Sequence, residues 1–378
     1  MRFRSLIIFG FVAGLALWGS DFVVHYLKHR LKPAARTPEV VSQSGAGIRA
    51  PASPEKPGGS ACVNIYRMVC QKHGETRDPT GFVQPDLDGE VEALRVYQDI
   101  IHDHPQWTSE QVDEALVETI YTPKLRKRLQ SAYRWVQRAI VRFINRQPDL
   151  VFNSWEKRQI IKRVRNTKLE LPPPASAYAD EPDLFTKNDV FYERSADGTT
   201  RMRVGGAYLL ASRSWFNLLF TLGHELGHSI DPCEMKSVGL MFPAYHRLES
   251  CFLRTGLIAA PKGRVECGDN DQLSETFADW VAVHVIGDAL KTFSTEFRGQ
   301  QVISAATNSV RDLCEQDDDL EQVETEYHPA PKVRIERIFG NNPTIREILG
   351  CGAPPLYCEF DSKPFASNPR EENKNASQ

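Results

Sequence analysis

Residues 215–228 read WFNLLFTLGHELGH and end on the pentamer His224-Glu225-Leu226-Gly227-His228. Apolar residues recur through this run at the spacing of one helical face: Trp215, Leu218, Leu219, Leu222 and Leu226. The periodicity predicts a helix that is partly packed in a core. On such a helix residues i and i+4 share a face, so both imidazoles can bind one metal ion with Glu225 beside them. Two histidines that only face solvent or each other are the alternative, so the surrounding sequence must decide.

A metal ion that activates water needs a third protein ligand and an open position. The run SETFADW supplies the best candidate, Glu275, and places Asp279 one helical turn later. Metal-bound histidines usually donate their other ring N–H to a carboxylate, and Asp279 is placed to accept it. Asp231, three residues after His228, can serve the second histidine in the same way. We therefore expect one Zn²⁺ per chain, bound by His224, His228 and Glu275, with an exposed helix acid as the alternative for Glu275.

Composition excludes several classes of protein. The chain has 378 residues, of which 41% are hydrophobic and 25% charged, so it is neither disordered nor collagen-like. The first 36 residues carry six Lys or Arg and one Asp, which leaves 40 basic and 48 acidic residues in the remainder. A body with this acidic balance is a poor nucleic-acid binder, so we expect no nucleic-acid partner.

The N-terminal segment, residues 1–27, predicts export. Arg2 and Arg4 precede a strongly apolar run that continues to Leu27, long enough to span a bilayer. Because no small-x-small cleavage site follows, we favour an uncleaved membrane anchor over a removed signal peptide. All eight cysteines follow this run, which fits disulfides in an oxidising compartment. We therefore expect an extracytoplasmic location on the membrane, with a secreted protein as the alternative.

The rest of the chain divides by composition and period. Residues 28–60 are rich in Pro, Ala, Ser and Gly and predict a flexible linker. In residues 61–182 apolar spacing predicts three or four amphipathic helices, whose many Arg and Lys residues fit a solvated outer face. Residues 183–360 carry the candidate metal ligands, and residues 361–378 predict a disordered tail. The resemblance described below implies that the first of these regions is a helical cap and the second a catalytic domain.

A short hairpin is expected at the start of the second region. The dipeptide Asp197-Gly198 suits a tight turn between strands at 189–194 and 199–210, and the helical period returns after Ser212. The fold class is therefore α+β and mainly helical.

These motifs together resemble the neprilysin family of zinc metallopeptidases, which are gluzincins with two His ligands and one Glu ligand. The family shares the pairs that correspond here to Glu275 with Asp279 and to His228 with Asp231. Its third motif corresponds to His328-Pro329, Arg334, Asn341-Asn342-Pro343 and Cys351. The resemblance extends from about Val204 to Tyr357 and implies a zincin (thermolysin-like) catalytic domain with a helical cap, here much reduced.

The resemblance also implies an activity. It is that of a zinc metalloendopeptidase on peptide or protein substrates, cleaving before hydrophobic residues, with Glu225 as general base for a zinc-activated water. His328 would donate to the oxyanion, and Arg334 would hold a substrate carbonyl and support the pocket. The family's substrate-pairing strand corresponds to Gly205-Gly206-Ala207-Tyr208, so Gly206 and Ala207 would bind substrate through their main chain.

The cysteine pairing is implied in the same way. The resemblance pairs Cys62 with Cys351, Cys70 with Cys314 and Cys251 with Cys358. Cys233 and Cys267 remain as a fourth pair without support from the family, and free buried thiols are the alternative.

Two other functions stay open. A membrane gluzincin of the CAAX-processing or heat-shock type shares the ligand pattern but needs several spans, whereas this chain has one candidate. A catalytically silent zincin-fold binding protein has no chemical need for Glu225, so the retained Glu argues against it.

Overall fold

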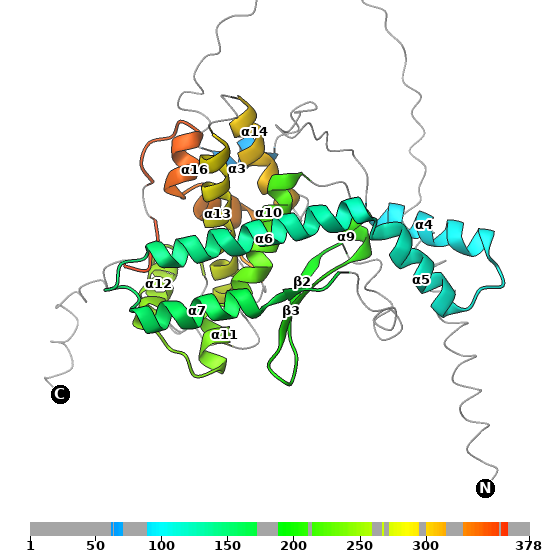
Figure 1. Cartoon of the computed structure of the whole chain (residues 1–378). Coiled ribbons are helices and arrows are strands. Elements are labelled where there is room, and N and C mark those ends of the chain that lie inside the picture. The colour runs from blue at the N-terminus through cyan, green and yellow to red at the C-terminus, as the bar shows by residue number, and fades with distance from the viewer. Residues whose placement is uncertain are drawn as a thin grey trace, which may run out of the picture. The chain divides into compact units, whose positions relative to one another are not determined.

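The computed structural model describes residues 62, 64–70, 89–171, 188–210, 214–258, 267, 272–294, 300–314, 328–354 and 357–361. Within these ranges the chain is mainly helical with one three-stranded sheet (Figure 1), so the predicted α+β, mainly helical class is confirmed. The predicted anchor, the linker and the tail beyond Asp361 lie outside the described residues. No helix in the described ranges is long and apolar enough to cross a bilayer.

Four amphipathic helices stand where the apolar spacing predicts three or four: α4 (Gly89–Asp103), α5 (Ser109–Ile120), α6 (Pro123–Arg146) and α7 (Ser154–Asn166). Three of these helices begin at an N-capping residue. Thr108 and Asn153 form capping boxes at α5 and α7, and Thr122 caps α6 ahead of a proline at its first position. The buried residues of α6 and α7 belong to the same core as those of the predicted catalytic domain.

The sheet contains β1 (Lys168–Leu169), β2 (Val190–Arg194) and β3 (Thr200–Val204) in the order β1-β3-β2. β2 and β3 form the predicted antiparallel hairpin, and Gly198 adopts a φ of 81° in its turn. β1 pairs parallel to β3 on the other side. β2 is therefore an edge strand, with one row of backbone groups facing away from the sheet.

The expectation that the second strand continues to Leu210 is wrong. β3 ends at Val204, whose carbonyl accepts from the Tyr121 hydroxyl at 2.7 Å, and residues Gly206–Leu210 form the short helix α9. Ala207 is fully buried in a small apolar cluster with side chains of α4 and α5. Gly206 and Ala207 therefore do not belong to a strand that can pair with substrate. Burial against two distant helices overrides the local strand pattern.

Two helices cross at the centre of the molecule, α10 (Trp215–His228) and α13 (Gln272–Phe293) (Figure 1). Their backbones approach closely because glycines of α10 face α13. A Cβ built on Gly227 would lie 3.0 Å from the Ala278 Cα, and one on Gly223 would lie 3.2 Å from the Ala282 Cα. α13 is apolar and buried along most of its length, so the crossing fixes both helices.

Short elements cover this pair: α3 (Ile65–Cys70), α11 (Pro232–Ser237), α12 (Pro243–Arg254), α14 (Gln300–Ser309), η2 (Arg311–Cys314), α15 (Pro331–Val333), η3 (Arg334–Phe339) and α16 (Pro343–Ile348). Four disulfides join them: Cys62–Cys351, Cys70–Cys314, Cys233–Cys267 and Cys251–Cys358. These are the pairs that the resemblance and the remaining two cysteines predict. Cys62, just before α3, is thereby attached to Cys351 of the third motif, and Cys70 at the end of α3 is attached to η2.

Candidate metal centre

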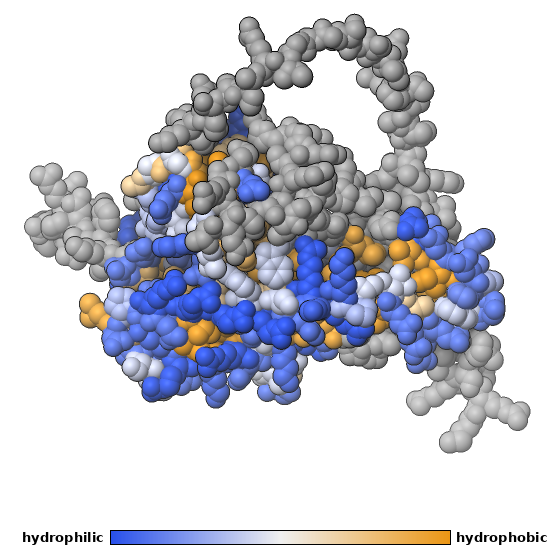
Figure 2. All heavy atoms as spheres, turned by 45° about the horizontal axis from the view of Figure 1, so that its top comes forward, coloured by the Kyte–Doolittle hydropathy of each residue, from blue (hydrophilic) through white to orange (hydrophobic). Residues whose placement is uncertain are grey.

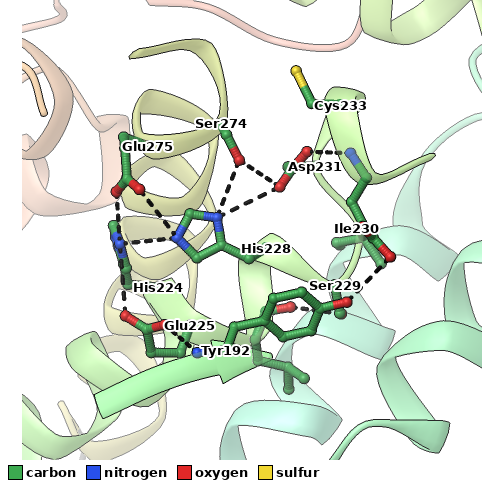
Figure 3. A network of polar contacts seen from close by, with 12 residues as sticks. Tyr192, His224, Glu225, His228, Ser229, Ile230, Asp231, Cys233, Ser274 and Glu275 are labelled. Atoms are coloured by element: carbon green, nitrogen blue, oxygen red, sulfur yellow. Dashed lines mark hydrogen bonds and ion pairs between the residues drawn. The ribbon is translucent and has the colours of Figure 1, made fainter. Parts of the chain in front are cut away.

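Three predicted ligands converge where α10 crosses α13 (Figure 3). His224 and His228, one turn apart on α10, bring their Nε2 atoms to 3.3 Å from each other. Glu275 of α13 faces both rings, with Oε2 3.1 Å from His224 Nε2 and Oε1 3.6 Å from His228 Nε2. The helix crossing thus assembles the predicted ligand set from residues about 50 positions apart in the sequence.

The far side of His224 is held by a carboxylate. Its Nδ1 lies 2.9 Å from Asp279 Oδ1, and Arg334 donates to Asp279 through Nε at 2.7 Å and Nη2 at 2.9 Å. Burial raises the pKa of Asp279, but the Arg334 and His224 contacts outweigh it and hold that pKa well below the usual value. Asp279 is therefore ionised and accepts from Nδ1–H, which leaves the Nε2 lone pair of His224 pointing into the site.

His228 is oriented through a serine that the sequence analysis missed. The Ser274 hydroxyl lies 3.1 Å from His228 Nδ1 and donates to Asp231 Oδ2 at 2.5 Å, while Asp231 itself is 3.5 Å from the ring. Asp231 also accepts from the Glu234 backbone N–H and so caps α11. Ser274 therefore accepts a hydrogen bond from the ring N–H and connects the ring to the Asp231 carboxylate. In the sequence, this role of Ser274 is indicated only by its position directly before Glu275.

This arrangement fits a tetrahedral cation. Ligand atoms at about 2.1 Å from a tetrahedral zinc ion lie about 3.4 Å apart, close to the separations among the histidine and Glu275 atoms. Glu275 Oε2 is buried and receives no hydrogen bond from the described residues, although ring nitrogens of His224 and His328 lie within 3.1 Å. Lone pairs that face one another at such distances repel unless a cation or a proton lies between them. Two imidazoles and one carboxylate are a donor set that hydrolytic zinc sites use.

Protons compete with a metal ion for these atoms. Burial lowers the pKa of both histidines, but the carboxylates outweigh it: Asp279 and Glu275 raise the pKa of His224, and Asp231 raises that of His228. Burial also raises the pKa of Glu275, yet the close ring nitrogens of His224 and His328 and the charge of His224 and His228 hold it well below its usual value. Metal binding at this site must therefore release protons, and acid must weaken it.

Glu225 lies beside the histidines, with its carboxylate held by the sheet. Oε2 accepts from the Tyr192 backbone N–H at 2.8 Å, and Oε1 is 3.8 Å from His224 Nε2. Burial raises the pKa of Glu225, and Asp189 and Glu275 add to the rise, whereas both histidines oppose it. The role of Tyr192 was not predicted, because only the fold brings its edge-strand amide to α10.

The remaining predicted residues divide into two groups. His328 is half-exposed and places Nε2 3.0 Å from Glu275 Oε2, so it borders the metal position. Its ligand atom also clusters with those of His224 and Glu275, which makes it a possible ligand as well as a donor. Arg334 is buried behind Asp279, Ala207 lies in the cluster with α4 and α5, and Gly206 is buried beside it in α9.

A cleft of about 560 Å³ opens in front of the site. Its described lining residues are Asp189, Val190, Phe191, Tyr192, His224, Glu225, His228, Asp231, Cys233, Glu234, Ser274, Glu275 and His328. They include three residues of β2 but not Arg334, so the guanidinium supports the wall of the site through Asp279. The edge strand and the metal ligands face the same space.

Comparison with known proteins identifies no relative of this chain. No family model matches the chain, and neither the curated proteins nor the solved structures contain a match to it. A functional assignment therefore rests on the chemistry of the centre.

Proposed function

We propose that the protein is a zinc-dependent metalloendopeptidase with a zincin-type catalytic domain and a reduced helical cap. The observation that carries the proposal is the convergence of His224 Nε2, His228 Nε2 and the Glu275 carboxylate, with Glu225 beside them. Three protein ligands with a carboxylate next to an open cleft are the arrangement of a hydrolytic zinc site. The resemblance to the neprilysin family in its third motif supports the same function.

Different residues of the chain would have different roles in hydrolysis. A zinc ion held by His224, His228 and Glu275 would lower the pKa of its bound water and polarise the scissile carbonyl. Glu225 would accept the proton of that water as it attacks and then deliver it to the leaving amine. The Tyr192 N–H holds the other carboxylate oxygen, so Glu225 is oriented before substrate arrives.

His328 would stabilise the charge that develops on the substrate carbonyl oxygen. It borders the metal position from the segment just before α15. A hydrogen-bond donor placed for that oxygen commonly contributes about 3 kcal/mol to transition-state binding.

The substrate would bind in extended form along β2. This strand lines the cleft, and its outward carbonyl groups are not used by the sheet because β3 occupies only its other edge, whereas the outward N–H groups of Val190 and Tyr192 are bonded to Asp189 and Glu225. β2 thereby takes the role that the sequence analysis gave to Gly206 and Ala207. Cleavage before hydrophobic residues, and action outside the cytoplasm from an N-terminal membrane anchor, complete the proposal on the grounds given by the sequence.

The test compares the full-length protein with Glu225→Gln and with Glu249→Gln, a matched change of a partly exposed carboxyl on α12. Each protein is titrated with zinc and then assayed on a mixed peptide library with and without a chelator. We expect one zinc equivalent for all three proteins. We expect chelator-sensitive cleavage for the wild type and Glu249→Gln, and a loss of about 10²-fold or more for Glu225→Gln.

Two results would overturn the proposal. One zinc equivalent without cleavage by any of the proteins would favour the silent binding protein. Failure to bind zinc would show that the proposed zinc site is wrong.

A further inference from the structure

Two packed helices of the cap region, α6 and α7, carry an unusual concentration of positive charge. Residues 123–168, which contain α6 and α7, include 14 Lys or Arg and only two acidic residues, although the whole chain has a formal net charge of −3. Positive charge on one pair of packed helices therefore contrasts with the acidic remainder of the molecule. Such a surface attracts anionic partners.

Part of this charge is used inside the protein. Arg142 and Arg146 pair with Asp288 of α13, Lys157 pairs with Asp149, and Arg163 pairs with Glu234 of α11.

Another part of the charge faces solvent. Among the exposed basic residues that form no ion pair within the described ranges are Arg134 and Arg138 on α6, and Arg158, Lys162 and Arg165 on α7. Their spacings of three and four residues place them on one outward face of each helix, which we call the basic face. Figure 2 shows a broad band of hydrophilic surface where these helices lie.

Large apolar side chains are exposed at one end of the basic face. Leu150, in the loop between the two helices, is 94% exposed, Trp155 at the start of α7 is 50% exposed, and Met241 is 59% exposed. The ring of Phe242, which follows Met241 in the chain, lies 6.1 Å from the rings of both Trp155 and Phe152, and Phe152 is two residues after Leu150. We call Leu150, Trp155 and Met241 the apolar tip. A cluster of such residues in one place marks an interaction site, whereas a single exposed Leu does not.

We propose that the basic face and the apolar tip form a docking surface for an anionic lipid bilayer. Lys and Arg side chains would lie against the negative headgroups while the apolar tip enters the boundary between headgroups and acyl chains. Trp favours that boundary, and exposed Leu and Met gain by leaving water there. A nucleic acid would match the charge but would leave the apolar tip in water. This surface is separate from the metal centre and does not depend on the proposed function.

Binding of the full-length protein to vesicles tests the proposal. Neutral phosphatidylcholine vesicles are compared with vesicles that contain about 30% phosphatidylglycerol. The N-terminal segment, with its six Lys or Arg, is the same in every variant below, so differences between the variants report on the basic face. We expect at least about tenfold tighter binding to the anionic vesicles, lost progressively as salt rises.

Matched variants locate the surface. The variant Arg134→Glu/Arg138→Glu/Lys162→Glu reverses three charges on the basic face. Its control, which reverses three exposed charges on other helices, is Arg95→Glu/Lys236→Glu/Lys291→Glu. We expect the first to lose about tenfold or more in the preference for anionic vesicles and the control to retain most of it. Circular dichroism verifies that both variants are folded.

The variant Leu150→Ser/Trp155→Ser tests the apolar tip without changing charge. We expect it to weaken binding to anionic vesicles several-fold and to leave binding to duplex DNA unchanged. Equal binding of the wild type to both vesicle types would overturn the proposal. So would equal losses in the charge variant and its control, or an unchanged vesicle affinity in the apolar-tip variant. Tighter binding to DNA than to anionic vesicles would assign the surface to a nucleic acid instead.

Discussion

Arg334 donates to both oxygens of Asp279, from Nε at 2.7 Å and from Nη2 at 2.9 Å, and both side chains are buried. Asp279 in turn holds His224, so an arginine from η3 is connected to a predicted metal ligand through one carboxylate. Arg334 and His224 are 110 positions apart in the sequence. The contact explains why an Arg belongs in the third motif without reaching the cleft.

Replacement of Arg334 by Ala tests this connection. The change leaves the Asp279 charge buried with one partner fewer, which typically costs about 3–5 kcal/mol of folding free energy. Loss of orientation at His224 should also weaken zinc binding by about 10- to 100-fold. Urea unfolding and a zinc titration measure the two effects. Arg337→Ala, at an exposed position of η3, serves as the control. Equal effects of the two substitutions would contradict the assigned role.

Ser274 offers a narrower test of the second histidine. We expect Ser274→Ala to weaken zinc binding by about tenfold or more, because His228 Nδ1 loses the acceptor that holds its ring and tautomer. Ser250→Ala removes a hydroxyl that donates to the His246 carbonyl of its own helix, and should leave zinc affinity unchanged. Competition against a chromogenic chelator gives both affinities. A Ser274 variant that binds zinc as tightly as the wild type would show that Asp231 alone orients the ring.

The proposed activity should depend on pH through Glu225. Burial raises the pKa of this carboxyl above its ordinary value of 4.5, and the Asp189 charge raises it further. Because the base must be ionised to accept a proton, a raised pKa moves the acid limb of kcat/KM to higher pH. At saturating zinc we expect that limb above pH 4.5, and we expect Asp189→Asn to shift it to lower pH. A pH-rate profile measures both, with Asp197→Asn in the exposed hairpin turn as the control. An identical limb in all three proteins would rule out this electrostatic coupling.

The helix crossing should tolerate no side chain at Gly227. A Cβ there would lie 3.0 Å from the Ala278 Cα and 3.4 Å from its carbonyl oxygen, so Gly227→Ala must push α10 and α13 apart. We expect a loss of about 1–3 kcal/mol in the free energy of unfolding, together with weaker zinc binding, since Glu275 lies on the displaced helix. Gly352→Ala meets no atom within 4 Å and should be close to neutral. Unfolding curves that do not distinguish the two variants would contradict the tight crossing.

Periodicity predicted the elements where one face of a segment is buried throughout. α6 and α7 follow their apolar spacing, and α10 follows the run that ends on the pentamer, because burial of one helical face repeats every 3.6 residues. The prediction was wrong at Gly206–Leu210, where a strand pattern continues but the chain forms α9. The packing of Ala207 with α4 and α5 decides that segment, and no local pattern contains it.

The sequence by itself determined which motif residues share one side of a helix. His224, His228 and Glu225 share a helix, and the spacing of four residues alone places both imidazoles on one side of it. Only the tertiary structure decided what surrounds them. The crossing of α10 and α13 brings Glu275 and Ser274 to the histidines, the edge of β2 brings the Tyr192 amide to Glu225, and η3 brings Arg334 to Asp279. These contacts join residues from separate elements, and their geometry is set by how the elements pack, which the order of residues along one element does not contain.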